Sequence, residues 1–243
     1  MKKCALITGA SGGIGSEIAL RLAKDGFSVA ACYCSDEKSA RELEEKLAQT
    51  GAEYRMYQLD VSDREKVNKV FADATEFFGG VSVLVNNAGI AQQKLFTDIT
   101  EQEFDKITAI NFKGVFNCCQ CAVPFMVAQK SGKIINISSM WGVCGASCET
   151  VYSATKAAVI GLTKALAREL APSNIQVNCV APGAIDTKMN ANLSAGEKKA
   201  FAEEIPMGRF GTAAEIAGVV SFLAGEDSGY VTAQVITADG GLI

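Results

Sequence analysis

Short apolar segments alternate with longer amphipathic segments along the chain, and this alternation restricts the fold more than any other feature. Seven segments are short, apolar and bounded by turn or polar residues, which is typical of buried strands. They are Ala5–Thr8, Ser28–Tyr33, Tyr54–Leu59, Val83–Asn86, Lys133–Ile137, Gln176–Val180 and Val235–Thr237. Between them, apolar residues recur at steps of three and four, which predicts helices that cover a sheet. These helices are expected at Ile14–Lys24, Glu37–Gln49, Arg64–Phe77, Val151–Leu170 and Ala213–Leu223.

Strands that are separated by helices imply right-handed crossovers and a parallel sheet with helices on both faces. We therefore expect an α/β fold with a doubly wound, seven-stranded parallel sheet. A length of 243 residues suits one domain, so residues 1–243 are taken as a single unit. Only residues 183–208 form a long segment without a clear pattern. We expect this segment to be a lid over a substrate site, or else a plain surface excursion.

Charge and the N-terminal residues restrict the partners and the location. A net charge of −4 and a pI near 5.1 give no basic surface for nucleic acid or anionic lipid. The first residues, MKKCALITGASGG, contain only a short apolar run, which fits neither a signal peptide nor a membrane span. We expect a cytoplasmic protein whose partners are small molecules or other proteins.

The chain has nine cysteines and no histidine. Cys32 with Cys34, and Cys118 with Cys119 and Cys121, form clusters, but no pair of C-x-x-C units accompanies them. We expect reduced thiols that act as small buried side chains, and no metal site. The absence of histidine removes the usual acid/base group, so proton transfer must use Tyr, Lys, Asp, Glu or Cys.

The sequence TGASGGIG follows the first expected strand and places Gly9, Gly13 and Gly15 where a helix begins, near Ile14. Glycines allow the backbone to turn tightly and to approach a pyrophosphate, which the helix N-terminus favours. The position of this turn predicts nucleotide binding. The alternative is an ordinary glycine-rich turn between a strand and a helix.

The G-x-x-x-G-x-G spacing of this turn resembles the variant found in the short-chain dehydrogenase/reductase family. Further motifs of that family follow in order over the rest of the chain: Asp60-Val61, NNAG at 86–89, Asn111, Ser139, YSATK from Tyr152 to Lys156, Pro182-Gly183 and Asp239-Gly240-Gly241. The resemblance implies a Rossmann-like fold and a nicotinamide cofactor. It assigns cofactor contacts to Gly9, Ser11, Gly12, Gly13, Ile14, Gly15, Tyr33, Ser35, Asp60, Val61, Asn87, Ala88, Gly89, Tyr152, Lys156, Pro182, Gly183, Ile185 and Thr187.

Tyr152 and Lys156 lie four residues apart at the start of an expected helix, hence on one face. A free tyrosine has a pKa of about 10, and a nearby ammonium lowers it. Ser139 ends the fifth expected strand, where its hydroxyl can hold a substrate oxygen, whereas Ser138 points to the other side if the strand pleat persists. We expect hydride transfer to a carbonyl carbon while Tyr152 protonates the oxygen.

Other roles come from the resemblance. Lys156 also binds the nicotinamide ribose, and Asn111 supports Lys156 through a water molecule. A buried amide bonded to the backbone is the alternative for Asn111. The same residues also serve an alcohol, sugar or steroid dehydrogenase, and a non-catalytic nucleotide-binding regulator is a further alternative.

The end of the second expected strand favours NADPH over NADH as the cofactor. An acidic residue there would hold the ribose hydroxyls and repel a 2′-phosphate, but this chain has Tyr33. Lys38 and Arg41 are candidate phosphate partners. Against NADPH stand Gly12, where many NADPH-dependent relatives have arginine, and the neighbouring acidic pair 36–37.

Length and the C-terminal sequence resemble 3-oxoacyl-[acyl-carrier-protein] reductases, which implies an acyl-carrier-bound or small-molecule ketone and fatty acid biosynthesis. The approach to Tyr152 departs from that group, because Trp141 and Glu149 flank the expected substrate pocket. This stretch is similar to reductases of an aminopentanone modification on elongation factor P. Glu149 can hold an amine, cap the Tyr152 helix or be solvated. The resemblance also implies a homotetramer, in which the apolar stretches 115–127 and 157–166 form interfaces or pack on the sheet.

Overall fold

A computed structural model describes residues 3–188 and 194–243 of the chain. Seven strands form one sheet in the order β3-β2-β1-β4-β5-β6-β7, and every neighbouring pair is parallel. The strands are β1 (Cys4–Ile7), β2 (Ser28–Tyr33), β3 (Tyr54–Gln58), β4 (Val83–Asn86), β5 (Gly132–Ile137), β6 (Ile175–Pro182) and β7 (Val235–Ala238). The doubly wound, single-domain α/β fold expected from the sequence is confirmed.

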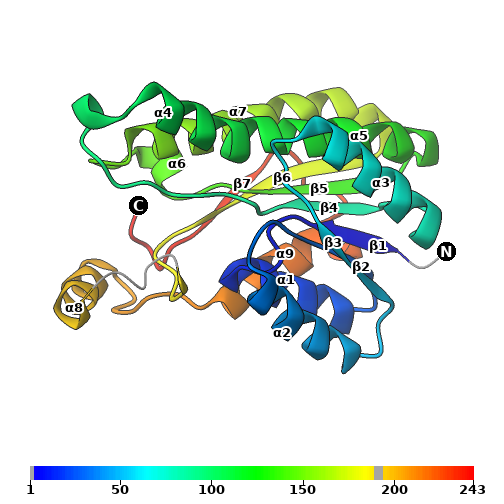
Figure 1. Ribbon diagram of the computed structural model, residues 1–243, viewed down its shortest axis with the longest axis horizontal. Helices are drawn as coiled ribbons and strands as arrows, with labels where there is room; N and C mark the ends of the chain where they lie inside the picture. Colours follow the sequence, from blue (N-terminus) through cyan, green and yellow to red (C-terminus); the bar gives the residue numbers. More distant parts are fainter. Residues whose placement is uncertain (1–2, 189–193) are drawn as a thin grey trace.

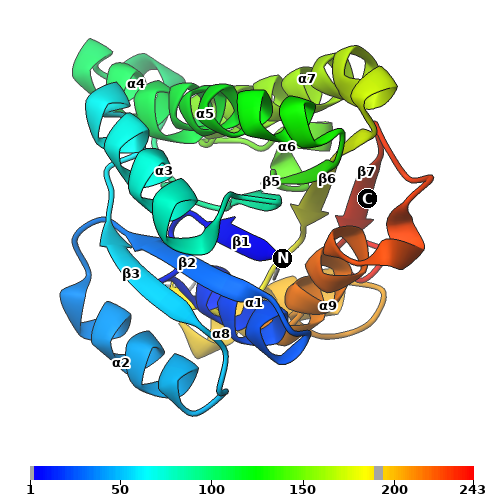
Figure 2. The ribbon, with the colours of Figure 1, turned by 90° about the vertical axis from the view of Figure 1, so that its right-hand side faces the viewer.

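Helices cover both faces of the sheet, as Figures 1 and 2 show. One layer holds α1 (Gly13–Lys24), α2 (Glu37–Ala48) and α9 (Ala213–Ala224). The opposite layer holds α3 (Arg64–Phe78), α4 (Glu101–Thr108), α5 (Gly114–Gln129) and α7 (Thr150–Leu170). The other helical elements are η1 (Phe96–Asp98), the π-helical turn η2 (Ala109–Lys113), α6 (Trp141–Cys144), η3 (Ala171–Ser173), α8 (Ala195–Glu204) and η5 (Glu226–Ser228).

Strand β1 shows why the sheet is buried on both faces. Its side chains alternate, so that Cys4 and Leu6 join the core beneath α3, α5 and α7, whereas Ala5 and Ile7 join the core beneath α1 and α9. All four residues are fully buried. A strand of this kind reads as a continuous apolar run, which is the pattern by which it was predicted.

The expected helices and strands agree with the structure to within a few residues at each end, and the main differences are helices that the sequence analysis did not identify. Residues 183–208 were expected to lack regular structure, but they contain α8. Ser194 and Glu197 form a reciprocal capping box at the start of α8, which gives the physical reason for the helix. Residues 189–193 of the expected lid lie outside the described residues. Thr100 and Glu103 make the same type of box at α4.

In the described part of the chain, no helix combines the length and the apolar character that crossing a membrane would require.

Candidate active site

The carboxyl ends of β1 and β4 meet at a turn where only glycine fits. Gly9 has a φ of +63°, and a Cβ on this residue would lie 2.9 Å from the Cα of Ala88. A Cβ on Gly15 would overlap the Gly9 carbonyl oxygen and would lie 2.6 Å from Nδ2 of Asn87. The three segments that contain Gly9, Gly15 and Asn87 are therefore packed backbone to backbone, as the sequence predicted for a phosphate-binding turn.

Thr8 and Asn87 hold this turn in place. The Thr8 hydroxyl oxygen accepts hydrogen bonds from the backbone N–H groups of Asn87 and Ala88, each at 3.0 Å. The Asn87 side-chain amide donates to the Thr8 carbonyl oxygen at 3.1 Å and to the Gly9 carbonyl oxygen at 3.0 Å. Sequence analysis did not assign a role to Thr8. Its position, a hydroxyl residue directly before the first glycine, was the available signal.

Helix α1 begins at this turn without a capping side chain, because its N-cap is Gly12, and no acidic residue occupies its first turn. The first N–H groups of the helix are thus left for an external anion. Thr187 comes close to the same end, since a Cβ on Gly13 would lie 2.9 Å from its Cγ2. These residues fit the pyrophosphate of a dinucleotide, with Thr187 contributing from the segment after β6.

Tyr152 lies in the first turn of α7 and is 8% exposed. Burial raises the pKa of its phenol to about 12; a side-chain hydrogen bond with Ser139 opposes this rise, and the nearby Glu149 carboxylate adds to it. The phenol is therefore protonated over the whole physiological pH range, and it lies close to the other hydroxyl of the predicted site.

Lys156 lies one turn further along α7 and is buried. Its Nζ donates a 2.9 Å hydrogen bond to the Ile137 carbonyl oxygen and lies 5.7 Å from the centre of the Tyr152 ring. Burial lowers the pKa of this amine to about 8. The sequence predicted that Lys156 lowers the pKa of Tyr152, but in this structure burial of the phenol outweighs any such effect.

The adjacent serines point in different directions, as the strand pleat predicted. Ser138 donates to the Lys156 carbonyl oxygen at 2.9 Å, so it fixes α7 to the end of β5. Ser139 lies near the Tyr152 phenol, whose pKa its hydroxyl lowers, and it accepts a hydrogen bond from the Trp141 backbone N–H at 3.2 Å. The hydroxyl that faces the phenol is therefore that of Ser139.

Asn111 is fully buried in the π-helical turn η2. Its side chain bonds both backbone groups of Ile90: it accepts from the N–H and donates to the carbonyl oxygen, each at 2.9 Å. It also donates to the Thr155 hydroxyl at 3.3 Å. The alternative of a buried amide bonded to the backbone thus describes Asn111 in this structure. Asn111 and Lys156 still approach each other, because a Cβ on Gly89 would lie 3.4 Å from Oδ1 of Asn111 and 3.3 Å from Nζ of Lys156.

Glu149 occupies the N-cap position of α7 but does not cap the helix, because its side chain makes no cap hydrogen bond. The capping alternative for Glu149 was therefore wrong. Within residues 3–188 and 194–243 its carboxylate has no hydrogen-bond or ion-pair partner, and burial raises its pKa. A half-buried carboxylate without a partner thus lies near the phenol of Tyr152. Trp141 begins α6, which packs on α7, and is partly buried.

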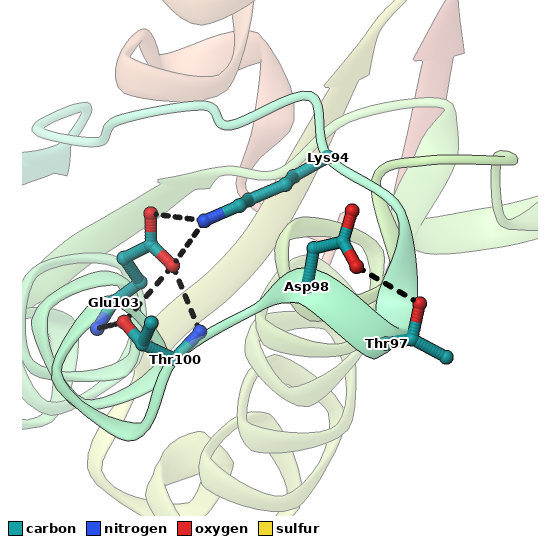
Figure 3. Close-up of polar contacts among 5 residues, drawn as sticks. All are labelled: Lys94, Thr97, Asp98, Thr100 and Glu103. Atoms are coloured by element: carbon teal, nitrogen blue, oxygen red, sulfur yellow. Dashed lines mark hydrogen bonds and ion pairs between the residues drawn. The ribbon is translucent and has the colours of Figure 1, made fainter.

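The loop that follows β4 contacts the approach to Tyr152. The Lys94 backbone N–H donates to the Cys148 carbonyl oxygen at 2.7 Å. The Lys94 side chain pairs with both carboxylate oxygens of Glu103 at 2.9 Å, and Figure 3 shows that the same carboxylate closes the Thr100 capping box. This contact ties the start of α4 to the loop and leaves the Lys94 charge paired.

Other predicted cofactor residues lie at the same edge of the sheet. Tyr33 ends β2 and is partly exposed, and Ser35 is exposed beyond it. Asp60 accepts hydrogen bonds from the backbone and side chain of Ser62, at 2.9 and 2.6 Å. Val61 is buried beneath α5, where a Cβ on Gly114 would overlap it.

Predicted cofactor contacts also lie at the end of β6 and in α2, the helix that follows β2. Pro182 ends β6, and Gly183 packs so closely on Asp239 that a Cβ would lie 2.6 Å from its Cα. Arg41, a predicted phosphate partner, pairs with Glu37 at 3.6 Å, and both side chains are exposed.

Three members of the cysteine clusters, Cys32, Cys118 and Cys119, belong to the core, whereas Cys34 is exposed and Cys121 is partly buried. Cys32 and Cys118 lie in the core beneath α3, α5 and α7, and burial raises the pKa of both thiols. They act there as small buried side chains.

The glycine-rich turn fits a dinucleotide, and the buried hydroxyls of Ser139 and Tyr152 lie at the same edge of the sheet, close to Lys156. This combination defines a nicotinamide-dependent oxidoreductase. The sequence profile described as enoyl-(acyl carrier protein) reductase matches residues 9–243. The chain belongs to the short-chain dehydrogenase/reductase family.

Relatives match the chain from end to end. The 3-oxoacyl-[acyl-carrier-protein] reductase FabG of Staphylococcus aureus is 45% identical over 242 residues, which cover 100% of this chain and 98% of the relative. The proteins of the same name from Thermotoga maritima and Aquifex aeolicus are 43% and 40% identical, over 99% of this chain and 98% and 97% of their own lengths.

Proposed function

We propose that the protein is a 3-oxoacyl-[acyl-carrier-protein] reductase that uses NADPH. The observation that carries the proposal is that Ser139 and Tyr152 lie close together in a buried site, with Lys156 on the same helix as the phenol. The full-length similarity to reductases of that name supports the substrate class.

The two hydroxyls have distinct tasks at the substrate. A bound nicotinamide supplies the hydride for the carbonyl carbon. Ser139 and Tyr152 both direct O–H groups to the carbonyl oxygen, where they orient it and stabilise the developing negative charge. Since the pKa of Tyr152 is raised to about 12, its phenol is the proton donor at neutral pH, which suits the direction of reduction.

Lys156 and Asn111 act behind the phenol. The Lys156 ammonium binds the nicotinamide ribose and favours the phenolate that remains after proton donation. Asn111 lies next to this amine at Gly89 and supports the return of a proton to Tyr152.

We favour reduction of a carbonyl over reduction of an enoyl group, although the matching family is described as enoyl-(acyl carrier protein) reductase. Reduction of a carbonyl adds a hydride to carbon and a proton to oxygen, and the neighbouring hydroxyls of Ser139 and Tyr152 suit donation to an oxygen. Reduction of an enoyl group adds both the hydride and the proton to carbon.

The experiment is a kinetic panel that follows NADPH and NADH oxidation with acetoacetyl, crotonyl and simple ketone substrates. We expect the acetoacetyl thioester to have the highest kcat/KM, with NADPH preferred. Preferential reduction of the crotonyl thioester, or no ketone-dependent oxidation with either cofactor, would contradict the proposal. The second result would instead favour a nucleotide-binding regulator.

A second candidate is a ketone that carries an amine, and the unpartnered carboxylate of Glu149 favours it. A half-buried carboxylate beside the phenol can pair with a substrate ammonium, whereas an acyl chain has no use for that charge. An amine-bearing ketone added to the same panel separates the two candidates, because only this substrate should lose kcat/KM in Glu149→Gln.

The expected assembly and location are also proposals. A homotetramer built on α4, α5 and α7 agrees with exposed apolar side chains on two of these helices. Phe104 on α4 is 49% exposed, and Phe116 on α5 is 45% exposed. A solution mass near one 25.5 kDa chain would contradict it. We also propose that the protein is cytoplasmic and that residues 183–208, of which 189–193 lie outside the described residues, cover the substrate.

A further inference from the structure

Lys188 connects two distant ends of the sheet. It follows β6, yet its Nζ donates a 2.7 Å hydrogen bond to the Ser39 hydroxyl in α2 and lies 3.5 Å from Oδ2 of Asp36. In the sheet, β1, β4 and β5 separate β6 from β2, which leads into α2. The contact therefore spans the carboxyl edge of the sheet on which the glycine-rich turn lies.

The backbone that carries Lys188 passes over the start of α1. Ile185 pairs with Gly211, and Thr187 lies against Gly13 at the N-terminus of α1. A dinucleotide that places its pyrophosphate at this terminus extends its adenosine toward the end of β2. Lys188 follows Thr187, and its contacts with Asp36 and Ser39 beyond the end of β2 place its ammonium on the adenosine side of the pyrophosphate site.

The Lys188 ammonium lies near an acidic side chain just beyond the end of β2. Asp36 is the nearest acidic residue in the chain after Tyr33, and its carboxylate already caps α2 through a 3.0 Å hydrogen bond from the Ser39 N–H. Its pKa is lowered, mainly by hydrogen bonds from Ser39 and further by Lys188. Lys188 thus compensates a carboxylate that would repel a 2′-phosphate at this point.

We propose that Lys188 determines cofactor specificity: its ammonium leaves Asp36 and Ser39 to bind the 2′-phosphate of NADPH. A phosphate dianion attracts an ammonium more strongly than a single carboxylate does, and the side chain is 80% exposed and free to turn. NADH offers only a hydroxyl at this position, so Lys188 stays on Asp36. The inference rests on the proposed use of a nicotinamide cofactor.

The test measures nucleotide binding without turnover. Calorimetry with adenosine 2′,5′-bisphosphate and with 5′-AMP isolates the contribution of the 2′-phosphate. Lys188→Gln should weaken binding of the bisphosphate about tenfold and leave 5′-AMP unchanged. Asp36→Asn keeps a capping side chain for α2 and should strengthen bisphosphate binding, because the competing charge is gone.

Lys198→Gln is the matched control. Lys198 is partly exposed, also lies after β6 and pairs with Asp186 at 3.2 Å, so its substitution should leave both affinities unchanged. Equal losses of bisphosphate affinity in Lys188→Gln and Lys198→Gln would show a general effect of positive surface charge and would overturn the inference. An unchanged bisphosphate affinity in Lys188→Gln would also overturn it. If neither nucleotide nor NADPH binds the wild-type protein, the proposed function fails instead.

Discussion

The Lys156 amine lies 5.7 Å from the centre of the Tyr152 ring and is bonded to the Ile137 carbonyl oxygen at 2.9 Å. The cation is thus anchored behind the phenol by the last residue of β5. Burial shifts the two pKa values in opposite directions, because it disfavours the charged form of each group. The pKa of the Tyr152 phenol rises to about 12, and the pKa of the Lys156 ammonium falls to about 8. The strand that ends beside Ser139 therefore also sets the position of the lysine.

Removal of the Tyr152 hydroxyl should abolish turnover but not cofactor binding. We expect Tyr152→Phe to lower kcat by a factor of about 10² to 10⁴, since the proton donor is lost while the ring still packs. NADPH fluorescence and ketone-dependent NADPH oxidation measure the two effects. Tyr230→Phe is the control, because Tyr230 is fully exposed and should have normal turnover. Near-normal kcat in Tyr152→Phe would remove Tyr152 from the mechanism.

Activity should fall as the pH rises through about 8. Burial lowers the pKa of Lys156 to about 8, so the ammonium that binds ribose is lost above that pH. Tyr152 remains protonated there because its pKa is about 12. The measurement is kcat/KM for NADPH against pH, which reports ionisations of the free enzyme. NMR titration of the lysine side chains, with Lys156→Met to assign the signal, gives the pKa directly. A profile that stays flat to about pH 10, near the ordinary lysine pKa, would contradict the assignment.

Asn111 should matter for stability as well as for activity. In Asn111→Leu the N–H and carbonyl groups of Ile90 lose their buried partner, and each unsatisfied group costs about 1–3 kcal/mol. Urea unfolding measures the loss. Asn68→Leu, at an exposed position on α3, should stay within about 0.5 kcal/mol of the wild type. An unchanged unfolding midpoint in Asn111→Leu would show that Ile90 finds other partners.

The carboxylate of Glu149 should affect the phenol but not the stability of α7. Glu149→Gln removes a charge that raises the pKa of Tyr152, and no cap hydrogen bond is lost. We expect a downward shift of the Tyr152 pKa, measured by ultraviolet titration against Tyr152→Phe, and an unfolding midpoint close to that of the wild type. Thr100→Ala supplies the contrast, because loss of its capping box should cost about 1 kcal/mol. A larger loss in Glu149→Gln than in Thr100→Ala would contradict this account.

The sequence predicted the fold well where structure depends on local pattern. β4 has the predicted bounds, because a fully buried strand is a continuous apolar run between polar residues. Helix α5 was harder to identify, since its apolar residues surround it and Pro124 lies inside it. The sequence also contains a local signal for helix α8, the capping box of Ser194 and Glu197.

The site was predictable as a set of residues but not as a set of contacts. Gly9, Ser139 and Tyr152 follow from strand ends and motif order. The bonds of Asn111 to Ile90 and of Lys188 to Ser39 join segments that are distant in the sequence, so no local pattern contains them. The pKa of Tyr152 depended on burial, which motif spacing does not report.

Two glycines in helices should respond oppositely to alanine. A Cβ on Gly15 would overlap the Gly9 carbonyl oxygen and lie 2.6 Å from Nδ2 of Asn87, so Gly15→Ala must displace the nucleotide-binding turn. We expect a loss of about 1–3 kcal/mol in stability and weaker binding of 5′-AMP. Gly161 lies in α7 with nothing within 4 Å of its Cβ position, so Gly161→Ala should gain about 0.5–1 kcal/mol through helix propensity and bind 5′-AMP normally. Urea unfolding and calorimetry measure both effects. Normal nucleotide affinity in Gly15→Ala would show that the turn can relax, and that its close packing does not serve the cofactor.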